Sequence, residues 1–356
     1  MTVVSDLQSD GILRLGGMKS GFRYRYARGG KPGRRHLARI STLRIPPAWK
    51  SVAIDVAESA WIQAVGQDSA GRWQYLYHAR AVARRERRKH ERLLAFTRNL
   101  PRLRGRIAQD LSRSDLGQDR VVATMLRILS ICFLRPGSEE YARDNGSYGI
   151  TTLRPRHVAV RGSSIRLRFH AKSGKDSEYE IEDRRVAAVV RRLLAAGGRR
   201  VFTFQDESGS WKEVRRQHIN AYIKSAMGES FSAKDFRTWA GTITCACALA
   251  KIGIDPAESP TALRKKVVAA VKETAETLGN TPAISRASYI SPSVIRAFEA
   301  GRVINGPVGS VRSLARSRNG LHRCERSLLR VLEEFGTAKR QEAGNGERTK
   351  RSRKKK

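Results

Sequence analysis

A tyrosine follows a turn in the stretch LGNTPAISRASYI, which covers residues 278–290 of an arginine-rich chain. This tyrosine is Tyr289. A phenol has an ordinary pKa of about 10 and is a weak nucleophile, so it attacks a phosphodiester only where cations activate it. The interpretation of the chain therefore depends on whether other segments supply groups that bind a phosphate.

The chain carries a large excess of positive charge. It has 70 Lys and Arg residues against 33 Asp and Glu residues, a formal net charge of +37 over 356 residues. Such an excess is typical of proteins that bind a polyanion. The sequence contains neither the roughly 18 consecutive apolar residues of a membrane-spanning helix nor the apolar core of an amino-terminal signal peptide. We therefore expect nucleic acid, not a membrane, as the partner.

The cysteines and histidines indicate no metal site. Cys132, Cys245, Cys247 and Cys324 form no Cys-x-x-Cys pair and have no histidine at zinc-finger spacing. We expect them to be reduced core thiols in the cytoplasm, and the seven histidines are dispersed. We assign no metal.

Two domains and a tail are expected from the change of pattern along the chain. Residues 1–90 are predicted to form a small β-rich domain. Its strand-like runs are Phe22–Tyr26, Leu37–Leu43 and Trp73–Tyr77. From Arg80 the pattern becomes helical and basic, and this segment is expected to join the domains. Residues 91–335 are predicted to form the larger domain, and residues 336–356 a basic, disordered tail.

The larger domain has mainly helical patterns around one predicted β-hairpin. In the hairpin, Ile165, Leu167 and Phe169 alternate with arginines, and the sequence KSGKD at residues 172–176 forms the turn. Helices are predicted up to Leu134 and then at Arg184–Leu194, Thr238–Lys251, Pro260–Leu278 and Leu314–Phe335. The predicted fold class is therefore α+β, with a small β-rich domain before a mainly α domain that contains a β-hairpin sheet.

Three cations in these surroundings suit attack on a phosphodiester. Arginine stabilises the charge that accumulates on the non-bridging oxygens, and lysine can protonate the departing sugar oxygen. Arg135 follows an apolar run in LRPG, Lys172 lies on the hairpin turn, and Arg237 lies in KDFRTW at residues 234–239. Lys175 shares the turn with Lys172, so either lysine could be presented there.

This order of motifs, ending in Gly-Asn-Thr-Pro and Tyr289, resembles the type IB DNA topoisomerases, particularly the small poxvirus and bacterial enzymes. GRWQYLY at residues 71–77 and NGSYGITTL at residues 145–153 extend the resemblance over most of the chain. The family shares its catalytic fold with tyrosine recombinases. The resemblance implies a two-domain clamp around double-stranded DNA that relaxes supercoils, and we expect a monomer associated with the nucleoid.

The resemblance also implies a role for each candidate. Tyr289 would attack the scissile phosphorus and form a 3′-phosphotyrosine, Arg135 and Arg237 would stabilise the transition state, and Lys172 would protonate the 5′ oxygen. Asn280 stands where viral and eukaryotic relatives carry a histidine that donates to a non-bridging oxygen. An amide can donate the same hydrogen bond but cannot exchange protons near neutrality. We therefore expect Asn280 to be a transition-state donor.

Contacts to DNA outside this site are expected from tyrosines and arginines. The resemblance places Tyr75, Tyr77 and Tyr141 near DNA, although tyrosines often simply cover core surface. The basic segment from Arg84 to Arg92 suits a helix that follows phosphates, or is a solvated face. Its candidate contacts are Arg84, Arg85 and Arg88.

Two alternative functions remain at this point. A tyrosine recombinase would share the fold and the nucleophile, but it should carry a His-x-x-Arg box, and Asp235-Phe236-Arg237 has no such histidine. A non-catalytic basic DNA-compacting protein would not need Tyr289. The chain has no Gly-x-x-x-x-Gly-Lys-Ser/Thr loop, since Gly174-Lys175 is followed by Asp176. We therefore expect no ATP and no other cofactor.

Overall fold

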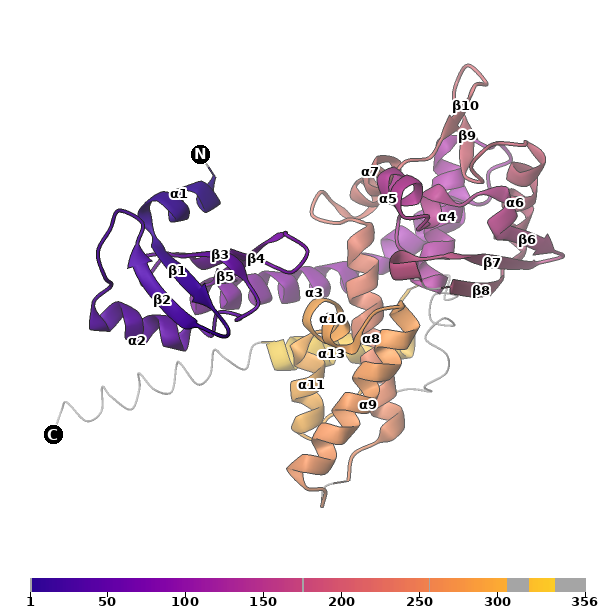
Figure 1. Ribbon diagram of the computed structural model, residues 1–356. Coiled ribbons are helices and arrows are strands. Elements are labelled where there is room, and N and C mark those ends of the chain that lie inside the picture. The colour runs from indigo at the N-terminus through magenta and orange to yellow at the C-terminus, as the bar shows by residue number, and fades with distance from the viewer. Residues whose placement is uncertain (1, 175, 256, 306–319, 337–356) are drawn as a thin grey trace. The chain divides into compact units, whose positions relative to one another are not determined.

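A computed structural model describes residues 2–174, 176–255, 257–305 and 320–336. The chain divides into two compact units, residues 1–89 and 90–356 (Figure 1). The boundary lies inside the long helix α3 (Ala79–Asp110). Each unit has its own hydrophobic core, so each is described by itself.

The first unit is a five-stranded antiparallel sheet with one helix packed against each face. The strands are β1 (Ile12–Gly17), β2 (Gly21–Tyr26), β3 (Lys50–Ile54), β4 (Ile62–Gln67) and β5 (Trp73–Tyr77), in the spatial order β2-β1-β3-β4-β5. Leu7 of α1 (Val3–Asp10) packs with Ala53 and Val65. Successive strand residues face opposite sides, so Ile54 and Ala64 pack on the other face, with Ile40 of α2 (Arg34–Thr42).

The prediction of a strand-like run at Leu37–Leu43 was wrong. These residues form most of α2, and Leu43 is its carboxy-terminal cap. The apolar residues Leu37, Ile40 and Leu43 recur every three positions, which is the spacing of a helix face and not of a strand. Ile40 is buried and Leu43 packs beside it against the sheet, so packing onto the sheet selects the helix.

The second unit is mainly α-helical and contains a small antiparallel sheet. Its sheet strands are β6 (Val158–Arg161), β7 (Ser164–His170) and β8 (Asp176–Glu182), and β9 (Thr203–Gln205) and β10 (Trp211–Glu213) form a separate hairpin. Besides α3, its helices are α4 (Gln118–Cys132), α5 (Glu139–Asp144), α6 (Arg184–Ala195), α7 (Arg216–Met227), α8 (Ala233–Ile252), α9 (Pro260–Leu278), α10 (Pro282–Ile284), α11 (Pro292–Glu299) and α13 (Arg323–Gly336). Short 3-10 turns occupy Ile150–Thr152, Pro155–His157 and Lys172–Gly174. The predicted α+β class is confirmed.

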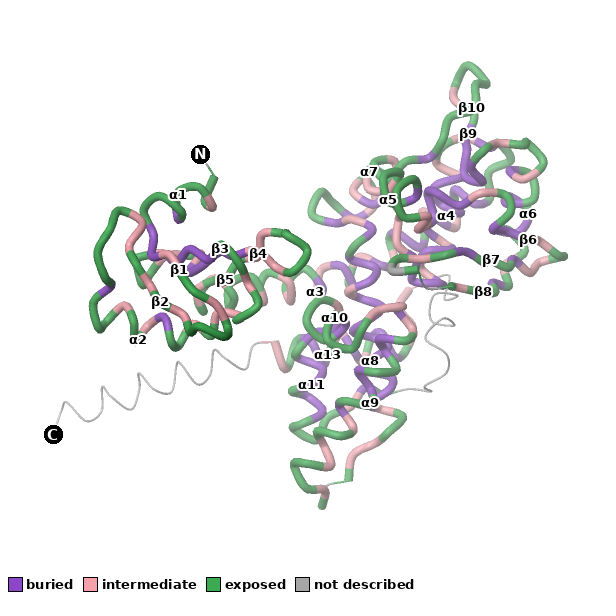
Figure 2. The backbone as a smooth tube through the Cα atoms, viewed as in Figure 1, coloured by how far each residue is buried: buried purple, intermediate pink, exposed green. Residues whose placement is uncertain are grey.

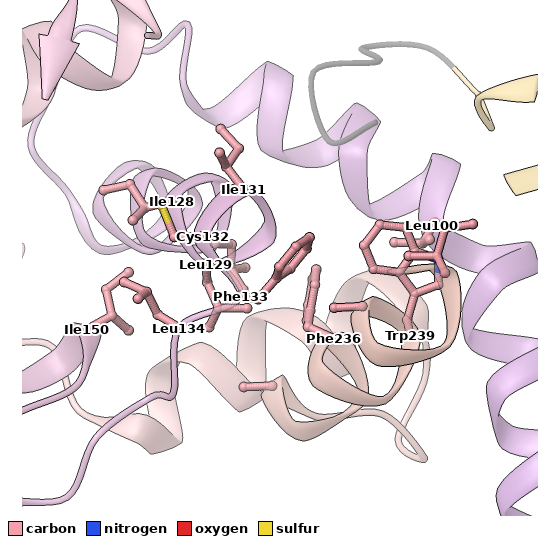
Figure 3. Close-up of a cluster of buried hydrophobic side chains, with 14 of the residues drawn as sticks. Leu100, Ile128, Leu129, Ile131, Cys132, Phe133, Leu134, Ile150, Phe236 and Trp239 are labelled. Carbon is pink, nitrogen blue, oxygen red and sulfur yellow. The ribbon is translucent and has the colours of Figure 1, made fainter. Parts of the chain in front are cut away.

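Helix α8 runs through the core of the second unit, as the buried colour of its tube shows (Figure 2). Phe236 and Trp239 are almost fully buried. The Trp239 ring meets that of Phe133, which follows α4, with the ring centroids 6.3 Å apart (Figure 3). Large rings buried in close contact hold helices in one register. The core therefore fixes the end of α4 against the first turns of α8.

Two of the predicted segments extend beyond what the structure describes. The last helix was predicted at Leu314–Phe335; α13 begins at Arg323, and residues 306–319 lie outside the described residues. The predicted tail lies outside them from residue 337 onward. In the described part of the chain, no helix is long and apolar enough to cross a membrane, and no three His, Cys, Asp or Glu residues are grouped to hold a metal ion.

Candidate active site

Arg237 is a buried cation that joins the ends of two helices. Its side chain lies on α8 and is only 4% exposed. One terminal nitrogen donates to the Phe133 carbonyl at 2.6 Å and the other to the Leu278 carbonyl at 2.9 Å. Phe133 caps α4 in the left-handed conformation (φ 55°), and Leu278 is the last residue of α9. Carbonyls at helix ends attract cations, so both helix termini favour a guanidinium here.

Arg135 and Asn280 form a hydrogen-bonded pair beside Arg237. An Arg135 terminal nitrogen donates to Asn280 Oδ1 at 2.5 Å. Gly279 ends α9 in the left-handed conformation (φ 59°), and the backbone N–H of Asn280 donates to the Ala275 carbonyl at 2.9 Å. Asn280 Nδ2 is buried and has no hydrogen-bond partner among the described residues. Arg135 thus orients the side-chain amide of Asn280, and both N–H groups of Nδ2 are left without a partner among the described residues.

The two guanidinium groups lie close together without an acidic partner. Burial, and then the charge of Arg237, lower the pKa of Arg135. Within the described part of the chain, neither arginine forms an ion pair with a carboxylate. Holding like charges together in a partly buried site is costly unless an anion binds there. The pair is therefore suited to bind an anion such as a phosphate.

Tyr289 lies at the end of a π-helical turn against Arg237. Thr281 caps α10, and the chain continues into the turn Ser285–Tyr289, which the Ile290 amide closes on the Ser285 carbonyl at 3.0 Å. Single π turns occur frequently at functional sites. The half-buried Tyr289 ring has the Arg237 guanidinium carbon 5.0 Å from its centroid.

Cations lower the pKa of the Tyr289 hydroxyl. Burial is the largest single influence and raises this pKa. The positive charge of Arg237, a hydrogen bond from Arg237, and the charges of Arg135 and Lys234 together outweigh it, so the pKa lies below its ordinary value. This is the change that a phenol needs to become a nucleophile.

Lys172 lies on the exposed turn between β7 and β8. At the base of the turn, His170 faces Asp176 across the strands, and their side chains approach to 2.5 Å. The Tyr148 amide also donates to the His170 carbonyl at 2.8 Å. Lys175 lies outside the described residues, so the choice of Lys172 over Lys175 stays a prediction.

One open cleft brings four of the five predicted catalytic residues together. It has a volume of about 370 Å³ and is lined by Arg135, Lys172, Arg237 and Asn280. The end of α4, the β7–β8 hairpin, α8 and the end of α9 supply these residues. Tyr289 is not among the lining residues but packs on Arg237. Segments far apart in the sequence thus converge on one cleft.

Several residues of this cleft were not among the predicted site residues. Tyr148, Tyr179 and Glu276 also line it. Tyr148 lies within NGSYGITTL, and its ring meets that of His157, with the centroids 4.4 Å apart. Tyr179 and Glu276 carry no local signal, because only the packing of β8 and α9 places them at the cleft.

The residues predicted to contact DNA elsewhere are exposed. Tyr75 and Tyr77 on β5 are 40% and 42% exposed, and their rings stack with centroids 6.3 Å apart. Tyr141 on α5 is 56% exposed. The exposed arginines on α3 are Arg84, Arg85 and Arg88. The Arg84 guanidinium lies 5.6 Å from the ring of Trp61, which sequence reasoning did not select.

Comparisons with known proteins match both units. Residues 78–299 match the family described as the catalytic core of eukaryotic DNA topoisomerase I, and residues 21–68 match the amino-terminal domain of bacterial DNA topoisomerase IB. A DNA topoisomerase 1B of Acanthamoeba polyphaga mimivirus is 33% identical over 268 residues, which cover 74% of this chain and 80% of the relative. The DNA topoisomerase 1B of vaccinia virus (strain Copenhagen) is 23% identical, with 67% and 75% covered.

Proposed function

Because the chain belongs to the type IB DNA topoisomerase family, we propose that Tyr289 is its nucleophile and that it relaxes supercoiled duplex DNA through a 3′-phosphotyrosyl intermediate. The protein is a type IB DNA topoisomerase, an isomerase that acts on DNA. The observation that carries the assignment of residues is that Arg135 and Arg237 line one cleft next to a tyrosine of lowered pKa, and that no ion pair to a carboxylate is found for either arginine in the described part of the chain.

The reaction exchanges one phosphoester for another. The Tyr289 oxygen bonds to the scissile phosphorus while the bond from phosphorus to the 5′ oxygen breaks. The tyrosine gives up its proton to water, and Lys172 donates a proton to the departing 5′ oxygen, which leaves as a 5′ hydroxyl. The free 5′ end rotates and supercoils are released. The 5′ hydroxyl then attacks the phosphotyrosine and returns its proton to Lys172, while the bond from phosphorus to the Tyr289 oxygen breaks and Tyr289 regains a proton from water, which restores the strand.

Arg135, Arg237 and Asn280 stabilise the negative charge that develops on the non-bridging oxygens. Preorganised donors in such a site lower the barrier because they need no rearrangement when charge develops. Arg237 is held by two backbone carbonyls, and Asn280 is oriented by Arg135. The Asn280 Nδ2 supplies a neutral hydrogen-bond donor, because an amide does not titrate near neutrality.

The phosphotyrosyl ester keeps most of the energy of the broken phosphodiester, so religation requires no nucleotide. We propose that the enzyme acts as a monomer without ATP or a metal ion. We also propose that it works on the nucleoid in the cytoplasm. Its second substrate in the cycle is the 5′ hydroxyl that cleavage has just produced.

A plasmid assay tests the reaction class. Purified protein, incubated with supercoiled plasmid in EDTA and without ATP, should release relaxed plasmid. Stopping the reaction with denaturant should trap protein on a 3′ end, and peptide mapping should place the link at Tyr289. An untouched plasmid would reject the proposed reaction, and an adduct on another residue would reject the assignment of Tyr289.

Contacts outside the cleft are proposed to hold the duplex in a two-domain clamp. Tyr75, Tyr77 and Tyr141 are exposed, as are the arginines Arg84, Arg85 and Arg88. Guanidinium contacts to phosphates release counterions, so affinity falls steeply with salt. Binding isotherms between roughly 50 and 200 mM salt should show this fall, and replacing Arg85 and Arg88 by alanine should reduce its slope. A flat salt response would contradict the clamp.

A further inference from the structure

The proposed nucleophile, Tyr289, packs against α8, the helix that carries Arg237. Gly241 lies one helical turn beyond Arg237 on α8, so both project from similar faces. A Cβ atom on Gly241 would lie 2.8 Å from Tyr289 Cβ, 2.8 Å from the Tyr289 carbonyl oxygen and 3.1 Å from Leu278 Cδ1. Carbon atoms in proteins do not approach that closely. Only glycine therefore lets the π turn lie this near to α8.

Thr242, also on α8, contacts the backbone at Tyr289 through its side-chain hydroxyl. Its Oγ1 lies 3.1 Å from the Tyr289 carbonyl and 2.8 Å from the Thr238 carbonyl, either of which can accept its proton. The same oxygen accepts the Ser291 amide at 3.1 Å. Since this hydroxyl meets the chain at Tyr289 and just beyond it, it holds the end of the π turn in place.

We propose that Gly241 and Thr242 are positioning residues for the reaction: together they form a seat on α8 that sets where the Tyr289 hydroxyl lies relative to Arg237. The inference rests on the proposed role of Tyr289 and goes beyond it. Arg237 and the seat belong to one buried helix, so the nucleophile and a stabiliser of its transition state are held by one rigid element.

A shift of Tyr289 relative to Arg237 should change both the cleavage rate and its dependence on pH. A displacement of about 1 Å in a reacting group can reduce a rate about 10²-fold. Tyr289 also owes its lowered pKa to nearby cations, with Arg237 the largest of them. A ring pushed away from Arg237 regains a higher pKa, so the rise of the cleavage rate with pH moves to higher pH. A purely structural role would not move that profile.

The first test compares two glycines inside helices. Gly241→Ala should reduce the single-turnover rate of DNA cleavage about 10²-fold, move the rate profile to higher pH, and leave non-covalent DNA affinity within about twofold. Gly105→Ala on α3 is the matched control, because an added Cβ meets no described atom within 4 Å. Its cleavage rate and pH profile should equal those of the wild type.

A second test covers the case in which Gly241→Ala does not fold. Thr242→Val removes the hydroxyl but keeps the shape, and should reduce cleavage about tenfold, which corresponds to one hydrogen bond of about 1.4 kcal/mol. Thr242→Ser restores the hydroxyl and should return the rate to within about threefold of wild type. Thr124→Val is the control, since Thr124 makes the same bond to the carbonyl four residues earlier, on α4.

The outcomes separate this inference from the proposed function. Wild-type protein that forms no adduct at Tyr289 would reject the proposed function itself. The proposed positioning role would be rejected by a different result. In that result the wild type forms the adduct, and folded Thr242→Val and Gly241→Ala cleave DNA at the wild-type rate and with the wild-type pH profile. Loss of cleavage in Thr242→Val with recovery in Thr242→Ser supports it.

Discussion

Arg237 and Lys172 line the same cleft but are held in opposite ways. Arg237 is buried on the central helix and donates to two helix-end carbonyls. Lys172 is exposed on a 3-10 turn between two strands. A group that stabilises developing charge acts best when it is fixed in advance, whereas a proton donor must reach an oxygen that belongs to the DNA. The difference agrees with the proposed roles, in which Arg237 is fixed before DNA binds and Lys172 is presented to the DNA.

The largest expected effect comes from removing the hydroxyl of the proposed nucleophile, Tyr289, which packs on Arg237. Tyr289→Phe should abolish covalent adducts and relaxation, because phenylalanine has no oxygen to attack phosphorus. DNA binding should stay within about twofold, since one hydroxyl is lost from many contacts. Denaturing gels and binding isotherms measure the two quantities, with Tyr26→Phe as a matched control. Continued nicking by Tyr289→Phe would contradict the assignment.

Arg237→Ala should cause the next largest loss of cleavage rate, and it should also reduce the stability of the fold. Losing one preorganised donor costs about 10²–10³ in rate. The Phe133 and Leu278 carbonyls also lose their partner, so the melting temperature should fall. Arg237→Lys keeps the charge but not the two-pronged geometry, and should recover stability only in part. A near-normal cleavage rate in Arg237→Ala would remove it from the site.

Lys172→Ala should slow cleavage without lowering the melting temperature, because the side chain is exposed. Loss of a general acid costs about 10²-fold or more. A substrate with sulfur in place of the departing 5′ oxygen needs no proton, so it should restore the rate of this variant but not that of Arg237→Ala. If Lys175→Ala shows this rescue and Lys172→Ala does not, the general acid is Lys175.

Asn280→Ala should have a smaller effect, about tenfold in cleavage rate for one neutral hydrogen bond. An amide does not titrate near neutrality, so the decrease should be the same from pH 6 to 8. Asn280→His should restore a donor. Single-turnover cleavage at several pH values measures both effects, and a strongly pH-dependent loss in Asn280→Ala would contradict the role of a neutral donor.

The smallest predicted effect is on stability and concerns His157, whose ring packs on that of Tyr148 at the cleft. Burial, followed by nearby positive charges, lowers the pKa of His157 to about 4. The unfolded chain, with a His pKa of about 6.5, therefore binds more protons between these values. The free energy of unfolding should fall as pH decreases from about 6.5 to about 4, by on the order of 1 kcal/mol. His157→Gln should reduce the change of the unfolding free energy with pH, measured by urea titration at several pH values. An unchanged pH dependence in this variant would contradict the role of His157.

Much of the fold was predictable because its signals are local. The alternation at Phe22–Tyr26 and Trp73–Tyr77 correctly indicated strands, and Pro260–Leu278 is a helix with those same bounds. The run at Leu37–Leu43 misled because a short apolar pattern satisfies a strand or a helix until its packing partner is known. The β9–β10 hairpin was missed because each of its strands has only three residues, too few to show an alternation. Helix α7 was missed although its buried residues Ile219, Tyr222, Ile223 and Met227 have helical spacing.

The family and the residue types of the site followed from the sequence alone, because arginine, lysine, tyrosine and asparagine bring their chemistry wherever they are placed. Tertiary structure decided how the residues act together. It buried Arg237 between two helix ends, left Asn280 Nδ2 without a partner among the residues that the structure describes, and brought Tyr289 against Gly241. These relations join residues far apart in the chain. Only the packing of α8 against α4, α9 and the π turn creates them, and no local pattern records such packing.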